Sequence, residues 1–108
     1  MIHVKPDDRV LLLSVPGSSD VRALAGQLRS GIVVCLVAAD RLHKLRRDLH
    51  DLENVMVAPA SEDGGIPWRE SFFSVVFAPD EAEPSADVLR VTAPGATIHL
   101  SGGGILRR

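Results

Sequence analysis

The sequence is poor in cysteine and in aromatic residues, and it carries little net charge. Its 108 residues include one cysteine, no tyrosine, one tryptophan and three phenylalanines. A single cysteine, Cys35, excludes a disulfide within the chain and is compatible with a reducing compartment. The net charge of −2 provides no broad basic field of the kind that binds nucleic acid or anionic membranes. We therefore expect neither a disulfide scaffold nor a nucleic-acid-binding protein.

Long hydrophobic runs and metal-ligand motifs are also missing. The longest apolar run, Ile32 to Ala39, is well short of the about 20 residues that cross a bilayer. The opening MIHVKPDD is polar and has no apolar core of a signal peptide. His43 and His50 lie farther apart than the i,i+4 spacing of a two-histidine metal site. We expect a cytoplasmic protein with no membrane partner and no metal.

The most informative stretch is RVLLLSVPGSS, from Arg9 to Ser19. Val10 to Leu13 form an apolar run without alternation, which is typical of a strand buried on both faces of a parallel sheet. A Pro-Gly-Ser-Ser turn follows, and then a helical pattern begins. Strand, tight turn and helix form the first half of a βαβ nucleotide-binding unit.

The same alternation continues along the chain. We expect strands at 9–14, 32–37, 54–58, 72–78 and 97–101. Helices are expected after the turn hydroxyls, which would cap the first, after Asp40, which would cap the second, and over 85–91 with Ser85 as cap. Gly31 is expected to end the first helix. The pattern predicts a single domain over 1–108, a three-layer α/β fold with a Rossmann-like doubly wound sheet of five parallel strands in order 3-2-1-4-5.

Three stretches resemble the class I S-adenosylmethionine-dependent methyltransferases, especially the small-molecule type 11 group. PDDRVLLLSVPGSSD resembles the family's first strand and its G-x-G-x-G turn. PWRESFFSVVFAPD resembles the proline-aromatic loop and Ser-Phe-Asp-Val-Val strand, and VLRVTAPGATIHLSG resembles the Leu-Arg-x-Leu-Lys-Pro-Gly-Gly turn before strand five. The resemblance implies the fold above, with S-adenosylmethionine as cofactor. It also implies that the family's strands six and seven, an antiparallel hairpin against strand five, are missing.

The chain departs from the family where the cofactor would be held. Leu12 stands in the acidic place of the first motif, and the glycine places fall on Ser14, Pro16 and Ser18. Val37 stands where the family has the acid for the ribose hydroxyls. Without its acidic partner, a buried hydroxyl of the cofactor stays unpaired, at a cost of about 1–3 kcal/mol. The departures predict weakened cofactor binding.

The resemblance still implies a set of site residues at the mouth formed by 14–19 and 78–81. For the cofactor these are Ser14, Gly17, Ser18 and Ser19 at the methionine end, Asp40 at the ribose, and Glu62 or Asp63 at the adenine. Asp80 and Glu81 form a pair of carboxylates that could orient the methyl acceptor, and Asp80 would be the catalytic residue; the alternative is a solvated acidic loop.

Three hypotheses for function remain open. The first is a methyltransferase-like Rossmann domain with degenerate cofactor motifs that serves as a non-catalytic binding or oligomerisation module. The second is a minimal S-adenosylmethionine-dependent methyltransferase acting on a small molecule or a protein, because methyl transfer needs little beyond alignment of donor and acceptor. The third is a nucleotide sensor that holds an anion at the first helix N-terminus.

A bare strand edge would favour a partner. The expected last strand, ATIHLS, alternates Ile98 and Leu100 with Thr97 and His99, so one of its faces would be less buried. We expect a homodimer through this strand-five edge, or a different protein partner. Burial of the edge by the tail, with Ile105 and Leu106, is the competing solution.

Overall fold

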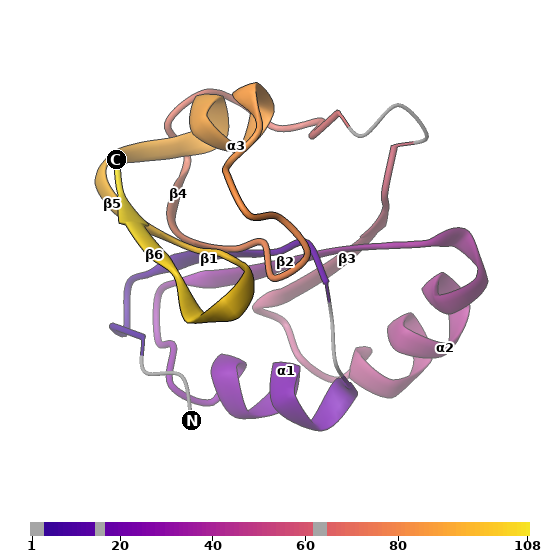
Figure 1. Ribbon diagram of the computed structural model, residues 1–108. Coiled ribbons are helices and arrows are strands. Elements are labelled where there is room, and N and C mark those ends of the chain that lie inside the picture. The colour runs from indigo at the N-terminus through magenta and orange to yellow at the C-terminus, as the bar shows by residue number, and fades with distance from the viewer. Residues whose placement is uncertain (1–3, 15–16, 62–64) are drawn as a thin grey trace.

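A computed structural model describes residues 4–14, 17–61 and 65–108 and has three layers (Figure 1). One sheet contains β1 (Arg9–Leu12), β2 (Ile32–Val37), β3 (Val55–Pro59), β4 (Phe73–Phe77), β5 (Thr92–His99) and β6 (Ile105–Arg107). Helices α1 (Ser18–Ala25) and α2 (Ala39–Leu49) lie on one side, and α3 (Ala86–Val91) lies on the other. A short 3-10 helix, Ser101–Gly103, precedes β6.

The strand order is β3-β2-β1-β4-β5-β6. The first five strands are parallel, in the predicted order 3-2-1-4-5, so the predicted fold class is confirmed. The sheet is doubly wound: the chain adds β2 and β3 on one side of the central β1, and then β4 and β5 on the other side. As predicted, the described residues between β3 and β4 contain no helix.

The sixth strand corrects the expectation of a bare edge at strand five. β6 pairs antiparallel with β5, with Ile98 opposite Leu106 and His99 opposite Ile105. The tail therefore covers the backbone of β5, which was the competing solution. It also supplies one antiparallel strand where the family resemblance implied that none would follow. The homodimer stays a prediction, and the outer edge on this side of the sheet is now β6.

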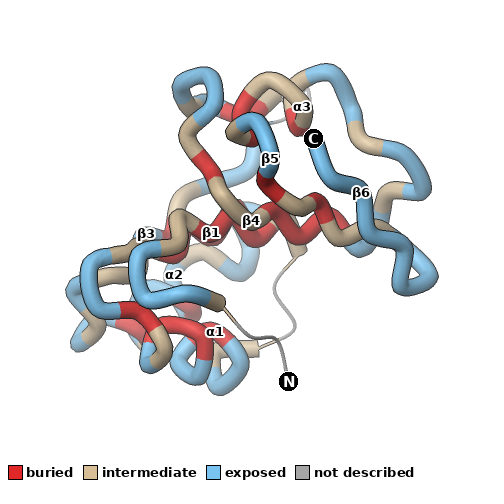
Figure 2. The backbone as a smooth tube through the Cα atoms, turned by 90° about the vertical axis from the view of Figure 1, so that its left-hand side faces the viewer, coloured by how far each residue is buried: buried red, intermediate tan, exposed pale blue. Residues whose placement is uncertain are grey.

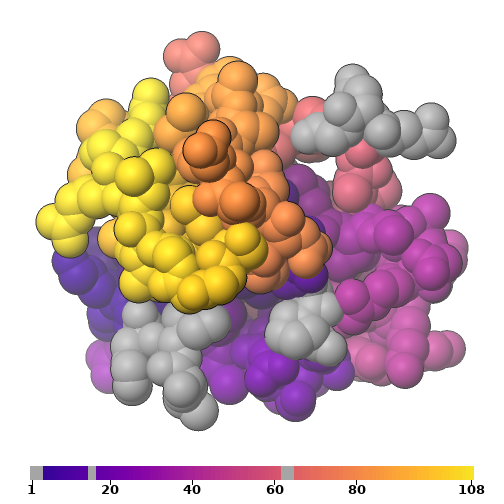
Figure 3. Space-filling view, viewed as in Figure 1, coloured from indigo at the N-terminus to yellow at the C-terminus, as the bar shows by residue number. Residues whose placement is uncertain are grey.

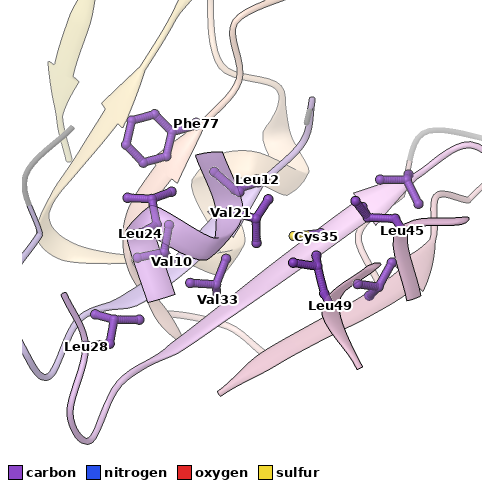
Figure 4. Close-up of a cluster of buried hydrophobic side chains, with 12 residues drawn as sticks. Val10, Leu12, Val21, Leu24, Leu28, Val33, Cys35, Leu45, Leu49 and Phe77 are labelled. Carbon is purple, nitrogen blue, oxygen red and sulfur yellow. The ribbon is translucent and has the colours of Figure 1, made fainter. Parts of the chain in front are cut away.

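Two apolar clusters hold the layers together. Alternate side chains of each strand point to opposite faces, so each strand serves both clusters. Figure 4 shows the cluster under α1 and α2, where Leu24 and Leu45 meet strand residues such as Val10, Val33 and Cys35. The cluster on the α3 side contains Leu11, Val34, Phe73, Val76, Val88, Val91 and Ile98. Figure 2 shows the buried residues concentrated in the central strands and the inner helix faces.

The ends of the first two helices differ from the expectation. Gly17 is the N-cap of α1 and no side chain caps it, so the turn hydroxyls do not act as caps. The first helix ends at Ala25, not near Gly31. Gly31 has another role: a Cβ there would lie 2.1 Å from the carbonyl oxygen of Asp8, so only glycine fits beneath that backbone.

Asp40 does not cap the second helix, because Ala38 holds the N-cap position and Asp40 lies within the first turn. There its charge still favours the helix dipole. The third helix agrees with the prediction: the hydroxyl of Ser85 accepts a hydrogen bond from the backbone of Val88 at 3.2 Å. The turn at 93–96, expected before strand five, is instead an irregularity within β5, where Gly95 has φ +82°.

Candidate functional site

The predicted mouth lies at the carboxyl ends of β1 and β4, where the direction of winding reverses. The two strands are neighbours there, and Leu13 donates from its backbone to the Phe77 carbonyl at 3.0 Å. In doubly wound sheets, ligands bind at this reversal. Three of the cavities that the described residues form lie around it. Predicted cofactor residues line two of them and none lines the third.

The first cavity, of about 490 Å³, lies between the N-terminal turns of α1 and α2. Four predicted cofactor residues line it: Gly17, Ser18, Ser19 and Asp40. Its other walls include the cationic side chains of Arg41 and Lys44. Both cationic residues are exposed, and they line the cavity together with the turn at 17–19. The cavity is therefore polar, with charges of both signs.

Ser14 lies apart from these four residues. It lines a second cavity of about 500 Å³ on the side of α1 that faces β4 and β5. The walls there are mainly apolar, with Leu24, Phe77 and Leu100 among them. The predicted methionine-end group is thus split, because α1 stands between Ser14 and the cavity that the turn residues line.

The third cavity, of about 440 Å³, opens on the α3 side of the carboxyl edge. It is lined by the ends of β1 and β2, the loop after β3 and the start of α3: Leu13, Leu36, Ala60, Ser61, Gly65, Ile66, Glu81, Ser85 and Val88. Glu81 is its one carboxylate among the described residues. Asp80, the predicted catalytic residue, is exposed and lines none of the three cavities. Glu62 and Asp63 lie outside the described residues.

A clamp that the sequence did not reveal holds one wall of this third cavity. The Arg90 guanidinium donates to the carbonyl oxygens of Trp68 at 2.6 Å and Ile66 at 2.7 Å, and to Asp87 at 3.0 Å. Asp87 accepts from the backbone of Ile66 at 2.6 Å. Hydrogen bonds from Arg90 and Ile66 lower the pKa of the Asp87 carboxyl. An Asp and an Arg three residues apart on a short helix were the only signal, and many exposed helices carry such pairs.

Burial shifts the pKa values of two titratable side chains in the sheet. Burial raises the pKa of the Cys35 thiol to about 12, so this cysteine is a core residue and not a nucleophile. Burial lowers the pKa of His99, whose ring stacks on Phe77 with centroids 4.4 Å apart. His99 and Phe77 are register partners in β5 and β4. No group of histidine, cysteine or carboxylate side chains in the described ranges is arranged to hold a metal ion.

The carboxyl end of β2 is apolar. Val37 is 4% exposed and packs in the cluster under α1 and α2. The residues after it are Ala38 and Ala39, so Asp40 is the first carboxylate, and it lies inside α2. A valine in the core cannot accept a hydrogen bond from a diol.

Comparisons with solved structures define the class of fold. A methyltransferase dependent on S-adenosylmethionine from Aquifex aeolicus superposes with a TM-score of 0.76 at 21% identity, over 91% of this chain and 57% of that one. The fibrillarin pre-rRNA processing protein of Methanococcus jannaschii superposes with a TM-score of 0.67 at 16% identity. The match covers 89% of this chain and 45% of that protein. A chain in the complex of the Haloferax volcanii Trm112 methyltransferase activator with a protein assigned as a methyltransferase superposes with a TM-score of 0.67 at 20% identity. The match covers 90% of this chain and 46% of that chain.

The chain therefore has the Rossmann-like fold of the class I S-adenosylmethionine-dependent methyltransferases. It spans about half of the length of these proteins. No family model matches the sequence, and neither does any curated protein. Among the described helices, none has the length and apolar character needed to cross a membrane.

Proposed function

We propose that this methyltransferase-like domain is a non-catalytic binding and oligomerisation module. One observation carries the proposal: residues implied as cofactor contacts face different cavities, with Gly17, Ser18, Ser19 and Asp40 in one and Ser14 in another. A ligand the size of S-adenosylmethionine is held tightly only when its polar groups are met from one site. The described residues do not fit this cofactor, so we derive no methyl-transfer step for the chain.

The chemistry of the individual residues supports the same conclusion. The ribose acid is replaced by buried Val37, and the cavity that contains Asp40 also contains Arg41 and Lys44. Asp48 lines this cavity as well, so its charges balance and it offers the positive sulfonium of S-adenosylmethionine no net attraction. Similarity to the Haloferax volcanii complex adds that a domain of this fold takes part in an assembly with a protein activator.

The second candidate is a minimal S-adenosylmethionine-dependent methyltransferase. The observation in its favour is the third cavity, of about 440 Å³, because it lies at the carboxyl ends of β1 and β2. In this candidate Glu81 replaces Asp80 as the carboxylate nearest to a bound molecule. The acceptor would be a small molecule or a protein side chain.

Calorimetric titration with S-adenosylmethionine and S-adenosylhomocysteine separates the two candidates. A site filled at 100 times its dissociation constant adds about 2.7 kcal/mol to stability. In a domain of this size that raises the melting temperature by roughly 10 °C or more. We expect neither heat nor a melting shift at millimolar ligand. A saturable heat that the Glu81→Gln variant weakens would overturn the proposal and establish the second candidate.

A further inference from the structure

The outer edge of β6 carries backbone groups that point away from the sheet. Leu100 donates from its backbone to the Gly104 carbonyl at 2.7 Å, and Arg108 donates to the Ala96 carbonyl at 2.9 Å. Gly104 and Arg108 therefore face β5, and alternation places Leu106 with them. The N–H and C=O groups of Ile105 and Arg107 face outward. Within the described part of the chain, no strand lies beyond β6 to pair with them.

The opposite edge of the sheet is protected against pairing at two of its outward positions. Asn54 and Ala60 bond to β2, so the alternate residues Val55, Val57 and Pro59 face outward. The carbonyl of Val57 accepts a hydrogen bond from Nε of Arg46 on α2 at 3.1 Å. Pro59 has no N–H to offer. Both features protect an edge strand, and β6 has neither; its protection is limited to its short length and the charge of Arg107.

Apolar side chains are also exposed at β6. Ile105 is 64% exposed and Leu106 is 40% exposed. Each of them is the last member of a row of register partners that crosses the sheet. The row on the α1 face is Leu12, Phe77, His99 and Ile105. The row on the α3 face is Leu11, Val76, Ile98 and Leu106. The inner members of both rows are buried or half-buried, and all of them except His99 are apolar.

We propose that β6 pairs antiparallel with β6 of a second copy of this chain, about a two-fold axis at Leu106. This inference rests on the proposed oligomerisation function and names its partner. In this register Ile105 lies opposite Arg107 of the second copy, and the outward backbone groups of both residues are satisfied. Leu106 meets Leu106 of the second copy, and the aliphatic part of Arg107 covers Ile105.

Other registers are less favourable. Pairing centred on Arg107 would place two guanidinium groups opposite each other, which is destabilising. Pairing centred on Ile105 would leave the outward groups of Arg107 without a strand residue opposite them. The register centred on Leu106 is the one that uses the whole strand.

Charge at the two ends of β6 fits the antiparallel arrangement. The strand ends at Arg107 and Arg108, whereas the turn before it packs on the acidic 79–84 loop, with Ser101 donating to the Glu81 carbonyl at 2.8 Å. Figure 3 shows the yellow C-terminal residues at the surface beside the orange segment that contains α3. A two-fold axis brings the basic end of one copy toward the acidic end of the other.

The closed edge at β3 explains why the assembly stops at two. A sheet open at both edges can extend without limit, whereas one open edge is used up when two identical edges meet. The second copy therefore completes the sheet without creating a new edge. A dimer, and not a filament, is the expected product.

A disulfide cross-link tests the register. Leu106→Cys would place two thiols at a non-hydrogen-bonded pair with Cα atoms about 4.5 Å apart, within disulfide range. Cys35 is buried and does not compete. We expect Leu106→Cys to form a covalent dimer on mild oxidation, and the matched variant Arg107→Cys to form much less. Equal cross-linking by both variants, or none by either, would overturn the proposal.

Measuring the mass over a range of protein concentrations tests for dimer formation through β6 without an introduced cysteine. We expect light scattering to move from 11.6 kDa toward twice that mass as concentration rises. Ile105→Pro removes one outward N–H, leaves the β5 bonds in place and follows Gly104, whose φ of −66° and ψ of 139° suit a residue before proline. This variant should stay monomeric, while Met56→Lys on β3 should dimerise as the unmodified chain does.

A chain that is monomeric at every concentration would overturn the dimer. If it also binds no S-adenosylmethionine, the binding-module proposal stands with a different partner. If it binds the cofactor, both proposals fail together. The two results are therefore distinguishable.

Discussion

The two edges of the sheet are built from similar apolar strands and are finished in opposite ways. At β3, a helix side chain, Arg46, occupies an outward carbonyl and Pro59 removes an outward donor. At β6, no strand of the described residues pairs with the outward backbone groups, and the side chains of Ile105 and Leu106 are exposed. α2 packs over β3, whereas β6 lies beyond the reach of α1 and α2 (Figures 1 and 2). Edge protection in this fold thus depends on whether a helix lies close enough to supply it.

Substituting an isoleucine in each of two neighbouring strands should show the largest difference in stability between the interior of the sheet and its open edge. Ile98 in β5 is fully buried, and Ile105 in β6 is 64% exposed. Ile98→Ala should cost about 2–5 kcal/mol in the free energy of unfolding, because it leaves a cavity. Ile105→Ala should change it by no more than about 0.5 kcal/mol. Urea denaturation at low protein concentration measures both.

The milder variant Ile98→Val guards against complete loss of folding. It should cost about 0.5–1.5 kcal/mol. Equal costs at the two positions would mean that β6 is packed in solution and is not an open edge.

Removing the protection at β3 should make the two edges alike. Arg46→Ala frees the Val57 carbonyl and should cost about 0.5–1.5 kcal/mol in the free energy of unfolding. With both edges open, the chain should form species larger than a dimer at high concentration, which sedimentation velocity detects. Arg47→Ala, the same change of charge at the next position of α2, is the control and should leave the size distribution unchanged.

On the β6 side, stability should fall in mild acid because of His99. Burial lowers its pKa below the ordinary value of 6.5, so the unfolded chain binds the proton more readily than the folded chain. The stability that neutral His99 contributes is complete above pH 6.5 and is lost as the pH falls below it. Melting temperatures across this range should decline in the unmodified chain. In His99→Phe, which keeps a ring on Phe77, the decline should be smaller.

On the α2 side, the smallest effect should come in stronger acid. Asp51 pairs with Arg22 at 2.9 Å, and the guanidinium lowers the pKa of the Asp51 carboxyl from 3.8 to about 2. The stabilisation is present above pH 3.8 and is lost as the pH falls toward 2. Both side chains are about half exposed, so salt should weaken the effect. Thermal melts of Asp51→Asn should show a flatter acid limb than those of the unmodified chain, and Glu53→Gln, at another exposed carboxylate nearby, serves as the matched control.

Much of the fold could be predicted from local pattern. The apolar runs at 9–14 and 32–37 and the turn residues between them are enough to indicate a parallel sheet, and right-handed crossovers then leave few strand orders. β6 escaped prediction because three residues, Ile105 to Arg107, are too few to show a period. Gly31 was misjudged, because its requirement for close backbone contact with Asp8 comes from a segment far away in the sequence.

The candidate site was less predictable than the fold. Sequence reasoning placed Ser14 with Gly17, Ser18 and Ser19 because they are close together in the chain, but α1 separates the cavities that they line. Of the pair Asp80 and Glu81 it favoured Asp80, whereas Glu81 is the one that lines the third cavity. Neighbouring side chains on a turn point in different directions, and a one-dimensional motif does not record the direction.

By itself, the sequence determined the five parallel strands and the approximate positions of the three α-helices, because these depend on the type and spacing of nearby residues. Only the tertiary structure decided which strand edge is closed, where the tail docks and which cavity each polar group faces. Those features depend on which segments, distant in sequence, pack together. Arg46 protects β3 because α2 packs beside it, and β6 stays open because no described helix reaches its outer side.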